Sequence, residues 1–154
     1  MELPRHIDLR IVTPERVLAH EQVDEVQIPG AGGYFGVLPG HAPLIALLKV
    51  GELWYRKGQT KTYLAVSEGF AEILPERVTI LARIAEKADE IDVQRAEAAR
   101  QRAEQRLKEP GLNVDLQRAR VALARALIRI DVANQVGLRG SARSSGAAAG
   151  RLHT

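Results

Sequence analysis

The sequence of 154 residues has no cysteine, only six aromatic residues and no long uninterrupted apolar run. The lack of cysteine excludes disulfide bonds, thiolate catalysis and cysteine-based zinc sites. No apolar stretch approaches the roughly 20 residues that a membrane-spanning helix needs. The first five residues include a glutamate and a proline, so we expect no signal peptide and, by default, a cytoplasmic protein.

Charge and aromatic residues are unevenly distributed along the chain. Hydrophobic residues make up 45% and charged residues 27%, which is typical of a globular protein. All the aromatic residues lie between Tyr34 and Phe70, and residues 1–87 carry a net charge of −1 against +4 for residues 88–154. The net charge of +3 is too small to argue for nucleic-acid binding by itself. The two halves therefore read as different kinds of structure.

Residues 1–87 are expected to form an antiparallel β-sandwich domain. Short β-branched or alternating segments are separated by turn residues every eight to twelve positions, a spacing typical of sandwiches and barrels. The segments expected as strands are 7–11, 23–28, 44–49, 53–55, 62–66, 69–74 and 78–82.

Residues 88–136 are expected to form an antiparallel two-helix hairpin. The first helix starts near Asp89 or Asp92, whose carboxylates suit a helix N-terminus, and ends near Lys108 before Pro110-Gly111. Asn113 or Asp115 can cap the second helix. The apolar residues of the second helix share one stripe: Leu116, Ala119, Leu123, Ala126, Ile130 and Ala133. The first helix offers Val93, Ala96, Ala103 and Leu107, and the alanines on both helices allow the two backbones to approach closely. Residues 137–154, rich in Gly, Ser, Ala and Arg, are expected to be a disordered tail.

No catalytic or metal site is predicted. The sequence lacks a G-x-x-x-x-G-K-[ST] loop, the glycine-rich segment 30–36 misses the dinucleotide-binding spacing, and the four histidines lack metal-ligand spacing. Segment 30–36 is more simply a loop between strands, and Ser67-Glu68-Gly69 a turn.

Arginines form a stripe on each expected helix. Arg95, Arg102 and Arg106 share one face of the first helix, and Arg118, Arg125 and Arg129 share one face of the second. Such stripes can receive a nucleotide phosphate or an acidic partner segment. They can equally be an ordinary solvated charged face.

The segment Gly36-Val37-Leu38-Pro39-Gly40-His41-Ala42-Pro43-Leu44 closely resembles the L-P-G-H-A-P-L signature of the epsilon chain of F-type ATP synthases. The resemblance extends over about residues 5–135. It includes the segments Ile7 to Pro14, Gln27 to Gly30 and Ser67 to Phe70, and the Ala/Arg-rich hairpin.

The resemblance implies a sandwich of about ten strands with a helical hairpin, and a non-catalytic rotor subunit that couples proton translocation to ATP synthesis. Its implied partners are the gamma subunit, the ring of c subunits and, through the hairpin, the catalytic alpha and beta subunits. The hairpin is implied to restrain ATP hydrolysis by changing from a compact to an extended state. The implied location is the cytoplasmic face of the cell membrane, as a peripheral protein.

The resemblance also implies a regulatory ATP site, with no required cofactor. Ile91-Asp92-Val93-Gln94-Arg95-Ala96 resembles the [IL]-D-x-x-R-A motif of bacterial epsilon chains that bind ATP. The residues implied to contact the nucleotide are Glu86, Ile91, Asp92, Arg95, Ala96, Arg102, Arg125 and Arg129. Asp92 can instead be a helix cap, and Ile91 and Ala96 packing residues.

Two segments are expected to contact the stalk or the ring: Ala31 and Gly32, and the turn formed by Pro39, Gly40, His41, Ala42 and Pro43. The tip at Ala31-Gly32 carries no charge, so ring contact there would rest on backbone hydrogen bonds and shape.

Three alternatives are a free-standing nucleotide-binding regulatory protein, a nucleotide-hydrolysing enzyme and a nucleic-acid adaptor. The missing phosphate-binding loop argues against the enzyme, and the lack of aromatic residues in the basic half argues against the adaptor.

Overall fold

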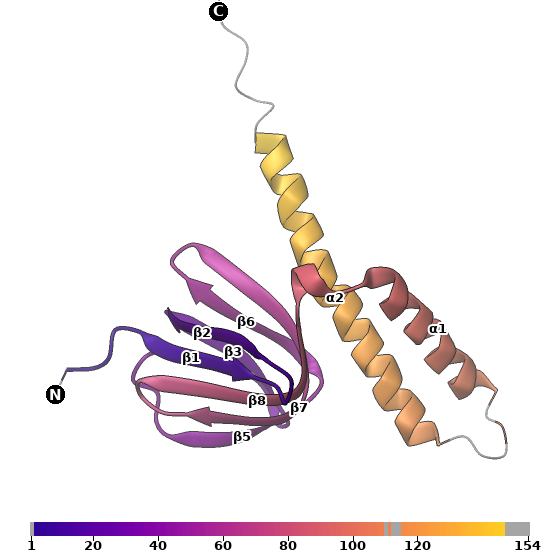
Figure 1. Cartoon of the computed structure of the whole chain (residues 1–154), viewed down its shortest axis with the longest axis horizontal. Coiled ribbons are helices and arrows are strands. Elements are labelled where there is room, and N and C mark those ends of the chain that lie inside the picture. The colour runs from indigo at the N-terminus through magenta and orange to yellow at the C-terminus, as the bar shows by residue number, and fades with distance from the viewer. Residues whose placement is uncertain (1, 110, 112–114, 147–154) are drawn as a thin grey trace, which may run out of the picture.

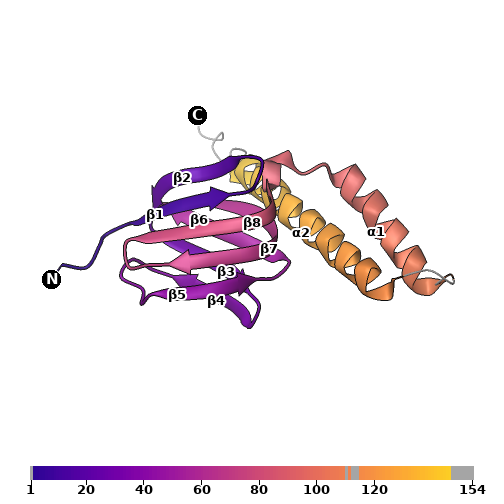
Figure 2. The same ribbon diagram turned by 60° about the horizontal axis from the view of Figure 1, so that its bottom comes forward.

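A two-layered β-domain is followed by a helical hairpin that lies against one end of it (Figures 1 and 2). The computed structural model describes residues 2–109, 111 and 115–146, with side chains described as far as Gly137. The described strands are β1 (Ile7–Val12), β2 (Val17–Val23), β3 (Glu25–Gly30), β4 (Gly33–Val37), β5 (Leu44–Leu48), β6 (Gly51–Lys57), β7 (Thr60–Ile73) and β8 (Arg77–Lys87). The described helices are the short η1 (Ala88–Glu90), α1 (Val93–Lys108) and α2 (Leu116–Gly146).

The strand order places β2, β1, β8, β7 and β5 side by side in one layer, with β3, β4 and β6 in the other. All pairings are antiparallel except that of β1 with β8, which is parallel. Side chains alternate along each strand, so every second residue points between the layers. The resulting core is formed entirely by strand residues within 7–85.

The β-sandwich was correctly predicted, but the strands differ from the prediction in number and extent. The described residues form eight strands, against the roughly ten that the resemblance implies. The two segments expected at 62–66 and 69–74 are one continuous strand, β7. Strand β4 and most of β2 were missed. Strand β4 contains Gly33 and Gly36, which obscure the alternation in the segment interpreted as a loop.

Strand β7 turns the corner between the two layers. It pairs with β6 up to Val66 and with β5 from Gly69 onward, while β8 accompanies both halves. Gly69 has φ of +140°, and a Cβ atom there would lie 1.9 Å from the carbonyl oxygen of Leu81. Only glycine fits this crossing of two backbones.

The hairpin helices begin at aspartate caps, as the sequence predicts. The Asp92 Oδ1 atom accepts a hydrogen bond of 3.0 Å from the backbone N–H of Arg95, and the Asp115 Oδ1 atom accepts one of 3.1 Å from that of Arg118. Each cap satisfies an amide that would otherwise lack a helical partner. Pro110 and Asn113 lie outside the described residues.

The two helices pack through alanine. Ala96 and Ala103 of α1 and Ala119 and Ala126 of α2 are all at most 2% exposed. Small side chains let the backbones approach closely, so α1 packs along α2 on the side away from the sheet (Figure 2).

Helix α2, together with the short helix η1, holds the hairpin against the β-domain. It contacts β6, β7 and η1, whereas α1 has no comparable contact with any strand among the described residues. The apolar part of this contact is a small cluster of four buried residues, Ala65, Ala88, Ile91 and Val132, with three partly buried ones packed against it, Tyr63, Ile128 and Ala133. Compared with the core of the sandwich, the hairpin therefore rests on a small apolar contact.

The prediction that a tail begins at residue 137 needs correction, because α2 continues to Gly146. Once a helix is nucleated, each further residue adds a backbone hydrogen bond at little cost, and Ala, Arg and Ser tolerate it. Gly137 therefore weakens the helix without ending it. The rest of the expected tail, 147–154, lies outside the described residues.

The Gly69→Ala substitution is expected to destabilise the β-domain by roughly 3 kcal/mol or more, because it combines a strained φ with a backbone clash. Gly32→Ala is the matched control, since no atom lies within 4 Å of its added Cβ. Urea unfolding of both variants measures the difference. Equal free energies of unfolding would contradict the corner geometry.

Candidate functional site

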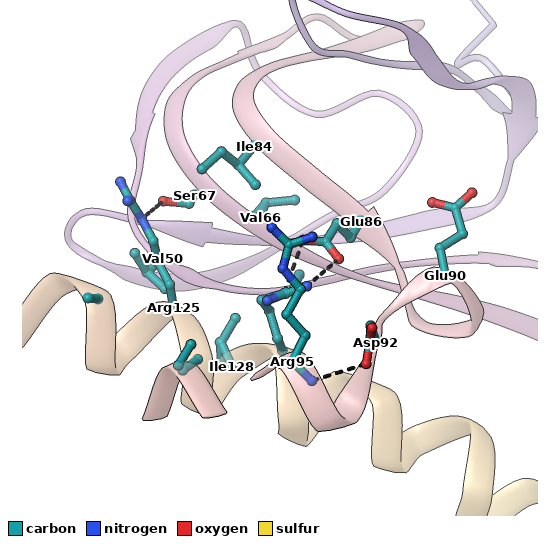
Figure 3. Close-up of a pocket in the computed structure, with 15 residues that line it drawn as sticks. Val50, Val66, Ser67, Ile84, Glu86, Glu90, Asp92, Arg95, Arg125 and Ile128 are labelled. Atoms are coloured by element: carbon teal, nitrogen blue, oxygen red, sulfur yellow. Dashed lines mark hydrogen bonds and ion pairs between the residues drawn. The ribbon is translucent and has the colours of Figure 1, made fainter. Parts of the chain in front are cut away.

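A cavity of about 490 Å³ lies where the β-domain meets the hairpin (Figure 3). Its wall comes from both parts: strands β7 and β8, the short helix η1, the start of α1 and the middle of α2. Three arginines and three carboxylates line it, Arg95, Arg125, Arg129, Glu86, Glu90 and Asp92. Its volume lies in the range of small-molecule sites.

Arg129 and Glu86 form the least exposed ion pair of this junction. The Nη2 atom of Arg129 donates a 3.1 Å hydrogen bond to Oε2 of Glu86, and its Nε atom lies 3.0 Å from Oε1 without the alignment of a hydrogen bond. The two side chains are only 21% and 25% exposed. This pair connects α2 to the C-terminal end of strand β8 and places two charged groups at the cavity wall.

Arg125 ties α2 to the corner of β7. Its Nε atom donates a 3.2 Å hydrogen bond to the hydroxyl of Ser67, and its Nη2 atom donates to Oε1 of Glu68. Ser67 is only 4% exposed, so its hydroxyl would lack solvent if Arg125 moved away. These partners were missed in the sequence, because 57 and 58 residues separate them from Arg125.

Arg95 extends from the first turn of α1 toward Glu86 (Figure 3). Among the ion pairs of the described residues it has no partner, in contrast to Arg125 and Arg129. Arginines from both helices thus meet in one cavity, an arrangement that suits a phosphate group.

Five of the eight residues expected at a nucleotide line this cavity: Glu86, Asp92, Arg95, Arg125 and Arg129. The other three do not. Ile91, 8% exposed, packs in the junction cluster, and Ala96, 0% exposed, packs between α1 and α2. Arg102 is exposed further along α1.

Arg16 holds the linker between the two parts. Its Nη1 and Nη2 atoms donate hydrogen bonds of 3.2 and 2.6 Å to the two carboxylate oxygens of Glu90. Arg16 lies in the turn between β1 and β2, 74 residues from Glu90. The hydrogen bond from Arg16 is the main reason that the pKa of Glu90 lies below its ordinary value.

The outer side of the five-stranded layer carries a row of exposed apolar residues, here called the apolar row: Val17, Leu81, Phe70 and Leu47. In the strand register Val17 and Leu81 both lie opposite Val12, and Phe70 lies opposite both Leu81 and Leu47. The four side chains are 63%, 52%, 52% and 56% exposed. Exposed apolar side chains in one row, on four of the five strands of the layer, indicate a protein-binding surface.

The apolar row was also missed in the sequence. The apolar run 44–49 was interpreted as an ordinary strand, and only the register shows that Leu47 adjoins Phe70 and Leu81 on the outside.

The two segments expected to contact partners lie at opposite ends of β4. Ala31 and Gly32 form an exposed turn between β3 and β4, with open space around Gly32. Residues Pro39 to Pro43 form the connection to β5, which is fixed by a 2.8 Å hydrogen bond from the Gly40 amide to the Pro75 carbonyl. Ala42 and Pro43 are exposed, whereas Pro39, Gly40 and His41 are half-buried.

Two general properties of the described residues bear on function. No three carboxylate or histidine side chains among them gather in a way that could hold a metal ion. None of the described helices combines the length and apolarity required to cross a membrane.

A sandwich with a row of exposed apolar residues on its outer side is typical of a subunit that binds other proteins. Two family profiles match the chain: "ATP synthase, Delta/Epsilon chain, beta-sandwich domain" over residues 6–88 and "ATP synthase, Delta/Epsilon chain, long alpha-helix domain" over residues 89–134. The chain belongs to the epsilon-chain family of ATP synthase, whose members are non-catalytic subunits of that complex.

Individual relatives agree with this assignment. The chain is 54% identical over 129 residues to the ATP synthase epsilon chain of Syntrophobacter fumaroxidans, covering 84% of this chain and 96% of the relative. It is 47% identical over 133 residues to that of Solibacter usitatus, covering 86% and 99%. A chain in the structure of the Euglena gracilis mitochondrial ATP synthase superposes with a TM-score of 0.73 at 26% identity, covering 90% of this chain and 84% of that one.

The Arg16→Gln substitution is expected to raise the pKa of Glu90 toward the ordinary glutamate value. A depressed pKa contributes stability above the unfolded-state value, and that contribution is lost as the pH falls through the folded-state value. Carboxyl-carbon NMR titration should therefore give a lower midpoint for Glu90 in the wild type than in Arg16→Gln. An unchanged Glu90 midpoint would refute the linker contact.

Proposed function

We propose that this chain is a rotor subunit of the central stalk of an F-type ATP synthase, where it helps to couple proton translocation to ATP synthesis. Family membership supports the complex, and the apolar row supports a large protein partner on the β-domain. We assign that partner as the gamma subunit. The apolar row needs a rigid surface, and the sandwich supplies it because its core is independent of the helices.

The remaining contacts are assigned by position. The exposed Ala31-Gly32 turn projects beyond β3 and β4 and offers backbone groups to the ring of c subunits. The hairpin, which is basic and lightly docked, is the part assigned to the catalytic alpha and beta subunits. The chain then acts as a peripheral protein at the cytoplasmic face of the cell membrane.

The hairpin is proposed to restrain ATP hydrolysis by leaving the docked position. A buried apolar side chain contributes about 1.5–3 kcal/mol when fully buried, and alanine contributes much less. The cluster at the junction has seven buried or partly buried members, of which three are alanines and only three, Ile128, Val132 and Ala133, belong to α2. Detaching α2 from the sandwich therefore costs little apolar burial, and the docked and extended positions can lie close in energy.

ATP is proposed as the regulatory ligand of the junction cavity. The observation that carries this proposal is the meeting of Arg95 from α1 with Arg125 and Arg129 from α2 in one cavity. Phosphate oxygens would bind these guanidinium groups, while Glu86 and Asp92 can accept hydrogen bonds from the adenine or ribose. The site exists only while α2 is docked, so bound ATP favours the docked hairpin through its differential affinity for the two states.

Truncation after Lys87 is expected to leave a folded chain that still joins the complex, because no helix residue belongs to the sandwich core. ATP synthesis should largely survive, whereas restraint of hydrolysis should weaken. The measurements are co-purification with gamma and the two activities of the assembled enzyme. A folded truncated chain that fails to join the complex would contradict this division of roles.

The Phe70→Glu substitution is expected to weaken gamma binding by about tenfold or more, because it places a charge at the centre of the apolar row. Val93→Glu is the matched control, since Val93 is 45% exposed but lies on α1. Surface plasmon resonance against gamma compares the two. Equal loss, or no loss, would exclude the apolar row as the stalk contact.

The Arg95→Ala and Arg125→Ala substitutions are each expected to weaken ATP binding by about ten- to over a hundredfold, the range for hydrogen bonds to charged groups. Arg120→Ala, exposed on α2 outside the cavity, should bind as the wild type does. Isothermal titration of ATP into the full chain is the measurement. No heat at millimolar ATP, or one affinity for all variants, would leave only the mechanical role.

A further inference from the structure

Glu68 has an unusual backbone at the corner of β7. It is the one non-glycine residue among those described with positive φ, at +55°. Residues with a side chain rarely adopt this conformation unless their surroundings enforce it. In the corner between Val66 and Gly69 the partner of β7 changes from β6 to β5, so Glu68 is paired with neither.

The carboxylate of Glu68 bridges the β-domain and the hairpin. Its Oε1 atom accepts a hydrogen bond from Arg125 on α2, and its Oε2 atom accepts one of 3.3 Å from Nη1 of Arg83 on β8. The unfavourable backbone thus coincides with a contact to the arginine that we assign to phosphate binding.

The charges at the junction are already balanced within the chain. The three arginines and three carboxylates that line the cavity cancel, and the charge of Glu68 beside Arg125 is offset by its second partner, Arg83. A polyphosphate brings several more negative charges. Its phosphate oxygens can bind the Arg125 guanidinium only if the carboxylate already bound there is displaced, because like charges at hydrogen-bond distance repel strongly.

Of the carboxylates paired with the cavity arginines, Glu68 is the easier one to displace from its arginine. The side chains of the Glu68–Arg125 pair are 43% and 33% exposed, against 25% and 21% for Glu86–Arg129. A more exposed carboxylate regains more of its hydration when it is released. Glu68 also keeps Arg83 as a second partner after leaving Arg125.

We propose that Glu68 is a built-in competitor for the phosphate site: its carboxylate occupies Arg125 when the cavity is empty and is displaced when a polyphosphate binds. This inference rests on the proposed nucleotide function and identifies the residue that sets its affinity. In the absence of ligand Glu68 also helps to hold α2 on the sandwich, beside the contacts of Arg125 with Ser67 and of Arg129 with Glu86.

The test is isothermal titration of the full chain with ATP and with inorganic triphosphate. Glu68→Gln removes the charge and keeps the shape, whereas Glu68→Gly also relieves the positive φ. Glu72→Gln is the matched control, because Glu72 is a half-exposed carboxylate on the same strand, 3.8 Å from Arg77 and outside the cavity. Circular dichroism establishes that each variant is folded, and Glu68→Gly replaces Glu68→Gln if the latter is not.

Both Glu68 variants are expected to bind about three- to tenfold more tightly than the wild type, as the loss of a partly exposed competing pair implies. Glu72→Gln should bind as the wild type does. In the Arg125→Ala background the gain from Glu68→Gln should vanish, because the competition is for that guanidinium.

The possible failures are distinguishable. Equal or weaker binding by the Glu68 variants, with a binding wild type, would overturn the competition and leave the nucleotide function intact. A gain that persists without Arg125 would overturn it as well. Detectable binding by Glu68→Gln when the wild type shows none would support the competition. The absence of binding by every variant at millimolar triphosphate and ATP would overturn the nucleotide function and the competition together.

Discussion

The position of α2 on the sandwich depends on a few contacts, and the cavity depends on that position. One small apolar cluster around Val132 and the arginines of α2 hold the helix against β7 and β8. Helix α1 follows, because it packs on α2 and not on the sheet. Any change that loosens α2 therefore moves the whole hairpin and dismantles the cavity.

This arrangement separates a stable part from a movable one. The sandwich completes its core with strand residues alone, which leaves the outer side of its five-stranded layer free to present the apolar row. The hairpin is stabilised mostly by its own alanine interface and by charged groups at the junction. An anion that binds those groups can therefore bias the hairpin position without disturbing the sandwich that carries it.

Features set by neighbouring residues could be predicted from the sequence, and features set by distant residues could not. The caps at Asp92 and Asp115 and the alanine stripes follow from local spacing, and the signature at 36–44 identified the family. The apolar row depends on strand register, and the contact of Arg125 with Glu68 depends on a corner 57 residues away. Strand β4 was missed because glycines interrupt its pattern, and α2 exceeds its predicted end because Gly137 does not stop a helix that is already formed.

If an anion in the junction cavity controls the position of the hairpin, the distance between α2 and the sandwich must depend on ATP. The chain has no cysteine, so spin labels can be placed through Glu76→Cys on the β-domain and Gln117→Cys at the start of α2, both exposed. Pulsed electron–electron double resonance then measures the distance between the two spin labels in the assembled enzyme. We expect one narrow distance at saturating ATP, from the docked hairpin, and a second, longer distance when ATP is removed, from the extended hairpin. An identical distance distribution in both conditions would contradict it.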